Sequence, residues 1–137
     1  QQDILQAQVS KYNLKQNVVF LGRLDKTELA NIISAADIFV LNTGYEGLSH
    51  QLLEVMHIGT PIITTNVGGN PELLSDGVDS VLLPFNDVQA FVDASNRLLS
   101  QPQYSEQLAR FAKARTKDFS REKAVAEIVN VFKLVHE

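Results

Sequence analysis

The feature that most constrains the fold is a repeated alternation of short apolar runs with segments of helical periodicity. The apolar runs are 18-VVFL-21, 38-IFVL-41, 62-IIT-64 and 81-VLL-83. Each is apolar at consecutive positions, which is typical of strands buried on both faces of a parallel sheet. The pattern predicts an α/β fold with helices covering that sheet. Such sheets bind ligands beyond the carboxyl ends of their strands, so the loops 22–26, 42–47 and 64–70 are candidate site loops.

The segments around these runs carry apolar residues three and four positions apart, as amphipathic helices do. Helices are expected over the first twelve residues, around residues 29–36, 48–59, 88–99 and 104–112, after Asn70 and after Ser120. Asp25 followed by Glu28 predicts a capping box. Asn70 before Pro71 and Asn86 predict two further N-caps, and Gly59 predicts the end of the helix that begins near Leu48.

Composition excludes several classes of protein. The chain has 137 residues, no cysteine and a net charge of -4, with lysine and arginine scattered along it. Disulfides and thiolate metal sites are therefore excluded, and nucleic acid is not an expected partner. The apolar runs are too short to span a membrane, so a cytoplasmic location is expected. The chain opens on a helical pattern without Met, which suggests a processed chain or a piece excised from a larger protein.

Two acids lie near the start of the helix that follows 42-NTGYEG-47, Glu46 just before it and Glu54 two turns inside it. Unpaired N–H groups at a helix start attract anionic oxygen. Glu46 and Glu54 lie about 12 Å apart along the axis and roughly 80° around it, too far to share a proton or a metal ion. They suit hydroxyl groups at two points of an elongated ligand, such as a sugar and a ribose. Alternatively, Glu46 only complements the helix dipole and Glu54 is solvated or ion-paired.

The segment 42–84 resembles the core of the C-terminal, donor-binding domain of retaining GT-B glycosyltransferases of the family 4, or group 1, type. Its acid–seven residues–acid spacing and its segments 46-EGLS-49, 53-LEVMHIGTPII-63 and 68-GGNPE-72 carry the likeness. Residues 18–43 and 87–137 are similar to the flanking elements. The resemblance implies a Rossmann-like three-layer α/β/α domain lacking its first elements. Residues 1–137 would then be one partial domain of a larger two-domain protein.

The resemblance also implies an activity, the transfer of a hexosyl group with retention from a nucleotide-diphosphate sugar. The acceptor, a saccharide or a lipid-linked molecule, would bind the missing N-terminal domain. No metal ion and no cofactor are implied. The isolated chain should bind donor weakly and be inactive. The parent protein would be cytoplasmic, and a peripheral association with the inner membrane surface stays open.

Site roles follow from the resemblance position by position. Glu46 would be the catalytic residue and hold hydroxyls of the donor sugar, and Glu54 would hold the ribose. The remaining donor-binding residues are Gly22, Arg23 and Leu24 near the base, and Gly47, Leu48, Ser49 and His50, whose backbone amides would hold the sugar and the diphosphate.

Several positions depart from the family pattern or have a second interpretation. Ser49 replaces a glycine, and His50 and His57 stand where the family often has apolar or small residues. His57 is expected on the helix surface, while the role of His50 is open. Arg23, Asp25 and Lys26 could contact phosphate or base, or be solvated. Gly68 and Gly69 could face the donor, but a tight turn before a helix is favoured.

Two other functions fit the same architecture, because folds of this class host many activities. One is a non-catalytic nucleotide-binding or regulatory module. The other is a nucleotide-sugar epimerase, which would release a changed sugar without any acceptor.

Overall fold

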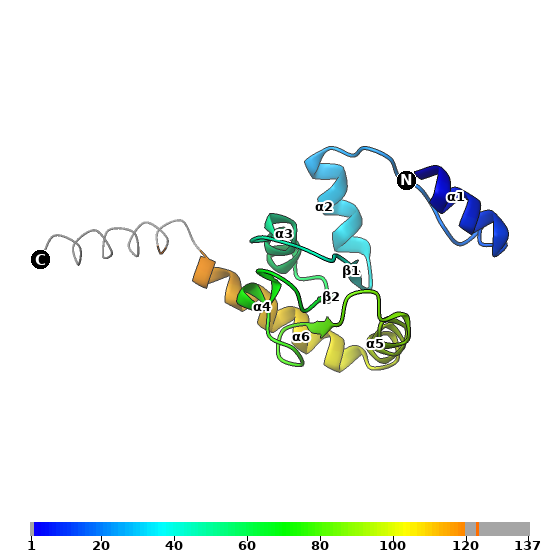
Figure 1. The fold of residues 1–137 in the computed structure, drawn as a ribbon. Helices are drawn as coiled ribbons and strands as arrows, with labels where there is room; N and C mark the ends of the chain where they lie inside the picture. Colours follow the sequence, from blue (N-terminus) through cyan, green and yellow to red (C-terminus); the bar gives the residue numbers. More distant parts are fainter. Residues whose placement is uncertain (1, 120–122, 124–137) are drawn as a thin grey trace, which may run out of the picture.

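A computed structural model describes residues 2–119 and 123 of the chain. Its centre is a parallel sheet of strands β1 (Phe39–Leu41), β2 (Ile62–Thr65) and β3 (Val81–Leu83), hydrogen-bonded in that order. Phe39 of β1 lies opposite Ile62, and Ile63 lies opposite Val81 of β3. The predicted parallel sheet is therefore confirmed for these strands (Figure 1).

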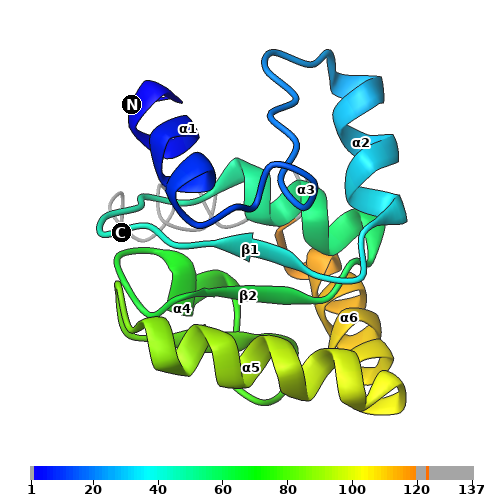
Figure 2. The same ribbon diagram turned by 90° about the vertical axis from the view of Figure 1, so that its right-hand side faces the viewer.

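Helices precede, connect and follow the strands. They are α1 (Gln2–Lys11), α2 (Lys26–Ala35), α3 (His50–Ile58), α4 (Asn70–Leu73), α5 (Val88–Ser100), α6 (Pro102–Arg115) and the 3-10 helix η1 (Thr116–Phe119). Figure 2 shows β1 and β2 with α2 and α3 on one side, α5 on the other, and α6 near one end of the strands. This is the expected three-layer arrangement.

The core consists of two clusters of buried apolar residues, one on each face of the sheet. They meet at β2, where neighbouring residues point to opposite faces. Ile62 packs with Ile33 of α2 and with the α3 residues Val55 and Met56. The next residue, Ile63, packs with α5 and α6 on the other face of the sheet. Helix α6 contributes to both clusters, through Ala112 and Leu108, and so closes the core across the two layers.

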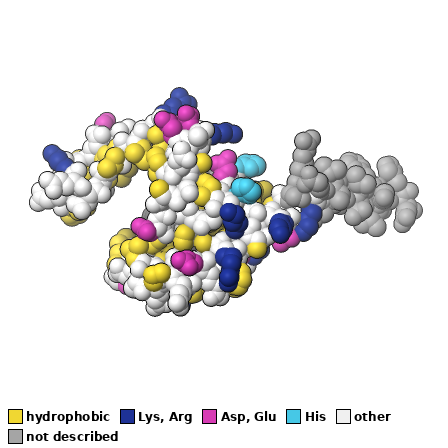
Figure 3. All heavy atoms as spheres, turned by 180° about the vertical axis from the view of Figure 1, so that it is seen from behind, with side chains coloured by type: hydrophobic (Ala, Val, Ile, Leu, Met, Phe, Trp, Pro, Cys, Tyr) yellow, Lys and Arg dark blue, Asp and Glu magenta, His cyan; other side chains and the backbone are white. Residues whose placement is uncertain are grey.

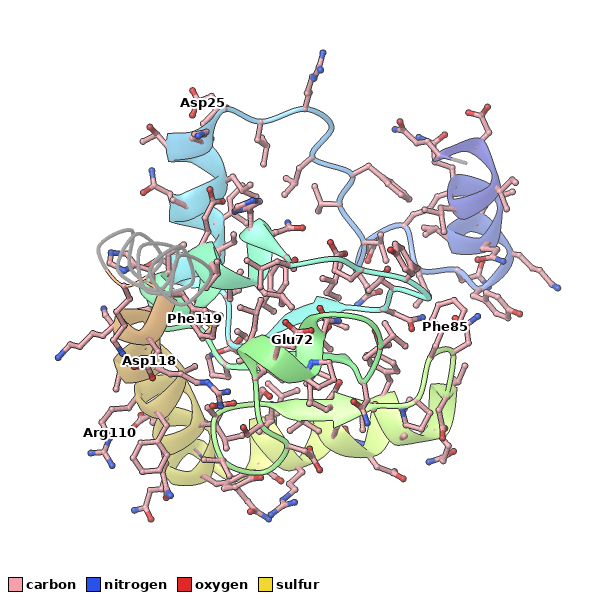
Figure 4. The ribbon with its side chains drawn as sticks, turned by 60° about the vertical axis from the view of Figure 1, so that its left-hand side comes forward. Asp25, Glu72, Phe85, Arg110, Asp118 and Phe119 are labelled. Atoms are coloured by element: carbon pink, nitrogen blue, oxygen red, sulfur yellow. The ribbon has the colours of Figure 1, made fainter. Side chains whose placement is uncertain are left out.

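Local sequence signals fix two helix ends as predicted. Asp25 and Glu28 form a reciprocal capping box at the start of α2, with hydrogen bonds of 2.8 and 3.0 Å (Figure 4). Helix α3 ends at Gly59, whose φ of 94° is the left-handed conformation that glycine adopts without strain. Lys113 of α6 donates to the Ile58 carbonyl near this end.

Two predicted N-caps were wrong. Gly69 is the cap residue of α4, and Asn70 lies inside the helix with its side chain buried. Its amide donates to the Thr65 carbonyl, since a buried carbonyl needs a partner. The cap of α5 is Asp87, whose side chain accepts from Ala90 N–H, while the Asn86 side chain is engaged by Asn42.

The predicted buried strand 18–21 was also wrong. The segment has no strand structure, and its side chains are exposed, with Val19 at 77%. In the described part of the chain β1 pairs only with β2, and residues 18–21 do not hydrogen-bond the open second edge of β1. An apolar run becomes a strand only where a partner satisfies its backbone groups.

The first predicted helix is confirmed as α1, whose residues are all at least partly exposed. The helix predicted after Ser120 lies outside the described residues, except for Lys123. Its ammonium hydrogen-bonds Asp118 and thereby lowers the pKa of that exposed carboxyl. Within the described residues no helix is long and apolar enough to cross a membrane.

A buried ion pair ties α6 to the connection between α4 and β3. Arg115 donates to Asp79 at 3.0 Å and to the Ser75 hydroxyl at 2.6 Å, and it also reaches the Glu72 carbonyl. Asp79 is only 3% exposed and accepts a further bond from Ser75 N–H. The contacts fully pair the buried carboxylate, which would otherwise be costly in this position.

Replacing Asp79 by alanine should destabilise the fold, because it removes the carboxylate that pairs with Arg115 and leaves Ser75 N–H without its acceptor. We expect Asp79→Ala to lower the free energy of unfolding by about 2–4 kcal/mol. Urea unfolding followed by circular dichroism measures this change. Asp37→Ala, at an exposed aspartate, is the control, and equal effects of the two substitutions would contradict the structural role of the pair.

Candidate functional site

The loops that follow β1, β2 and β3 converge at the carboxyl ends of the strands, where the sequence predicted a site. Asn42 and Asn86 join the first and third loops through two hydrogen bonds of 2.9 and 3.2 Å. The Phe85 ring packs against Gly44 (Figure 4). Gly69 N–H donates to the Glu46 carbonyl at 3.0 Å. The loop that carries Glu46 is thus held from both sides.

Two consecutive glycines allow the loop after β2 to touch the turn at Glu46. A Cβ atom on Gly68 would lie 1.9 Å from the Glu46 carbonyl oxygen, and one on Gly69 would lie 2.4 Å from the Gly47 carbonyl oxygen. Gly68 also has a φ of 52°, which side-chain-bearing residues rarely adopt. The predicted tight turn is confirmed, and its glycines additionally set the position of Glu46 and Gly47.

Buried threonines of β2 hold the end of β1 and the loop that carries Glu46 through hydrogen bonds. Thr64 and Thr65 of β2 donate their hydroxyls to the carbonyls of Leu41 and Thr43, at 3.0 and 2.7 Å. Asn70 then donates to the Thr65 carbonyl. The sequence predicted Thr64 at the end of a strand and both threonines in the candidate loop 64–70, without assigning their hydroxyls a role. Two threonines at the end of a buried apolar run were the available signal, since buried hydroxyls need acceptors.

The start of α3 presents backbone N–H groups that the protein leaves free. Ser49 is the N-cap, is buried, and accepts from Leu52 N–H. Its side chain therefore serves the helix, which explains a serine at the position of the family glycine. Among the described residues, the N–H groups of residues 47–51 have no acceptor. With the positive end of the helix dipole, they form a site suited to an anion.

A cavity of about 410 Å³ lies between α2 and α3, next to this helix start. It is lined by Lys26, Leu29, Ala30, Ile33, His50, Leu53, Glu54, His57 and Ile58. The two described histidines lie together on this face, with an acidic side chain beside them (Figure 3). In residues 2–119 none of the charged or imidazole groups of this cavity has a hydrogen-bond or ion-pair partner. These side chains are therefore available to a ligand.

The structure brings together only some of the predicted site residues. His50 and Glu54 share the cavity, whereas Glu46 lies half-buried in the turn before the helix and does not line it. Gly22, Arg23 and Leu24 lie on the loop before α2, outside the cavity. Of the charged residues at that loop, Lys26 does line the cavity. His57 of α3 is exposed on the helix surface, as predicted, and also lines the cavity.

No metal centre accompanies this arrangement in the described residues, where no group of three or more His, Cys, Asp or Glu side chains is placed to hold an ion. The chemistry available here consists of hydrogen-bond donors for an anion, carboxylates for hydroxyl groups and an apolar cavity floor.

Comparison with known proteins gives a single family. The family model described as "Glycosyl transferases group 1" matches residues 1–118. The chain is 33% identical to a glycogen synthase of Mycobacterium tuberculosis, over 96% of this chain and 32% of the relative. It is 35% identical to an Escherichia coli UDP-Gal:alpha-D-GlcNAc-diphosphoundecaprenol alpha-1,3-galactosyltransferase, over 63% of this chain and 22% of the relative.

Solved structures agree with this result. Sucrose-phosphate synthase from Thermosynechococcus elongatus superposes with a TM-score of 0.85 at 28% identity, covering 96% of this chain and 33% of that one. The structure of Anabaena Alr3699/HepE in complex with UDP gives a TM-score of 0.85 at 25% identity, covering 96% of this chain and 36% of that one. The chain thus spans about a third or less of the relatives named here.

The contact of Gly68 with Glu46 can be tested by adding one methyl group. Gly68→Ala should lower the free energy of unfolding by about 2–4 kcal/mol, because the new Cβ overlaps a backbone oxygen in addition to the strained φ. Gly77→Ala is the matched control: Gly77 has a φ of 69° but open space around it, so about 1 kcal/mol is expected. Urea unfolding of both variants measures the two losses of unfolding free energy. Equal losses would mean that the contact between Gly68 and Glu46 is unimportant.

Proposed function

Because this chain belongs to the glycosyl transferases group 1 family, we propose that it forms the donor-binding half of a retaining hexosyl transferase that uses a nucleotide-diphosphate sugar. The observation that carries the proposal is the set of free N–H groups at the start of α3, between Glu46 and the cavity that contains Glu54. A diphosphate would accept hydrogen bonds from these N–H groups. The sugar on one side of it would then reach Glu46, and the ribose on the other side would reach Glu54.

The free N–H groups would act on the leaving diphosphate. When the bond between the anomeric carbon and the diphosphate oxygen breaks, negative charge develops on that oxygen. Fixed N–H donors and the dipole of α3 stabilise such charge without reorganising. Gly47 leaves open space at this point, so phosphate or sugar oxygens can approach the backbone closely.

The two acids would hold the ends of the donor. Glu46, fixed by its backbone contact with Gly69, would accept hydrogen bonds from hydroxyls of the transferred sugar and orient it for reaction. Glu54 would accept from the ribose hydroxyls in the cavity. The Gly22–Leu24 segment would approach the base from the loop before α2.

The compared proteins support a nucleotide-sugar donor. Anabaena Alr3699/HepE was solved with UDP, and the Escherichia coli relative is named for UDP-Gal. The acceptor, a saccharide or lipid-linked molecule bound by a further domain, and the cytoplasmic location belong to the proposal. Family membership favours a transferase over the regulatory-module and epimerase alternatives.

The proposal predicts selective binding of one type of nucleoside diphosphate. Ligand-observed NMR of the chain against UDP, GDP, ADP and CDP should show one preferred ligand. Glu54→Ala should weaken it about 10-fold or more, because a charged hydrogen-bond acceptor is lost.

Glu106→Ala, at an exposed glutamate of α6, is the matched control and should leave binding unchanged. If no diphosphate binds, or if Glu54→Ala and Glu106→Ala behave alike, the proposed donor site is wrong.

A further inference from the structure

His57 is a member of the cavity wall that neither the family resemblance nor the spacing of the acids assigns to the site. Its ring lines the same cavity as Glu54, together with Lys26 on the opposite helix. No other group among residues 2–119 and 123 hydrogen-bonds it. A free imidazole beside a free carboxylate, above an apolar floor, is a surface that a ligand can bind.

The position of His57 along α3 gives it a specific neighbour in a bound donor. His50, Glu54 and His57 follow the i, i+4, i+7 spacing and share one face of the helix. His57 lies one turn beyond Glu54, about 4.5 Å further along the axis and away from the helix start. Along the axis of α3, the order is therefore the free N–H groups, then Glu54, then His57.

A nucleoside diphosphate has its chemical groups in a matching order: diphosphate, ribose, base. With the diphosphate at the N–H groups and the ribose at Glu54, the next group along the helix is the base. We propose that His57 contacts the nucleobase and contributes to the choice of base. This inference rests on the proposed function, since it takes the direction of the donor from the diphosphate and ribose positions.

The chemistry of the cavity suits a base. Imidazole can donate and accept hydrogen bonds on its two ring nitrogens, so it can recognise a base edge. Its ring can also stack on a base, as aromatic side chains commonly do. Leu29, Ile33 and Leu53 supply the apolar surface that the flat face of a base covers well. Lys26 contributes a positive charge on the opposite wall.

The test compares a ligand that has a base with one that lacks it, and the unsubstituted chain with a variant that lacks the His57 side chain. The preferred nucleoside diphosphate and the base-free compound ribose 5-phosphate are titrated against the chain by ligand-observed NMR. His57→Ala should weaken the diphosphate about 3- to 10-fold and leave ribose 5-phosphate unchanged. His57→Gln, which keeps a donor and an acceptor, should recover part of the loss. Glu54→Ala should weaken both ligands.

Controls separate the two proposals. Gln107→Ala, at an exposed polar residue of α6, should change neither affinity, and circular dichroism confirms that each variant is folded. If His57→Ala leaves the diphosphate unaffected, or weakens both ligands equally, the inference is wrong while the donor site stands. If the unsubstituted chain binds no nucleoside diphosphate, both proposals fail.

Discussion

The complete burial of β2 is the constraint on which the rest of the structure depends. All four of its residues are buried, and Ile62 and Ile63 belong to the two apolar clusters on opposite faces of the sheet. The buried hydroxyls of Thr64 and Thr65 also need hydrogen-bond acceptors, which are the carbonyls of Leu41 at the end of β1 and of Thr43 in the loop after it. The core and the loop with Glu46 are therefore positioned by the same strand, in which apolar packing and polar pairing act together.

Backbone contacts act together with these side-chain hydrogen bonds in determining the shape of the candidate site. The turn at Glu46 is fixed by Gly69 N–H and by the close approach of Gly68. The buried Ser49 caps α3 and leaves the N–H groups of residues 47–51 without an acceptor. Such fixed donors need no rearrangement when an anion arrives, which is a favourable property for binding charge. Side chains then add selectivity at the rim and in the cavity.

Sequence periodicity predicted the elements well, because apolar spacing reflects burial directly. It misjudged residues 18–21, since an apolar run does not reveal whether a strand partner is present. It misplaced the caps at Asn70 and Asn86, because asparagine satisfies a buried carbonyl or a neighbouring loop as readily as a helix start. Glu54 and His50 were predicted in the site, whereas the position of His57 in the cavity wall depends on how α2 lies across α3, which local patterns do not encode.

Helix α3 has consequences for stability as well as for recognition. One of its faces supplies Leu52, Val55 and Met56 to the core, and another supplies His50, Glu54 and His57 to the cavity. The cavity exists only while that core is intact, so any molecule that occupies it binds the native state alone. By mass action, a higher concentration of that molecule then raises the temperature at which the domain melts. Occupancy of the cavity and thermal unfolding are therefore coupled equilibria.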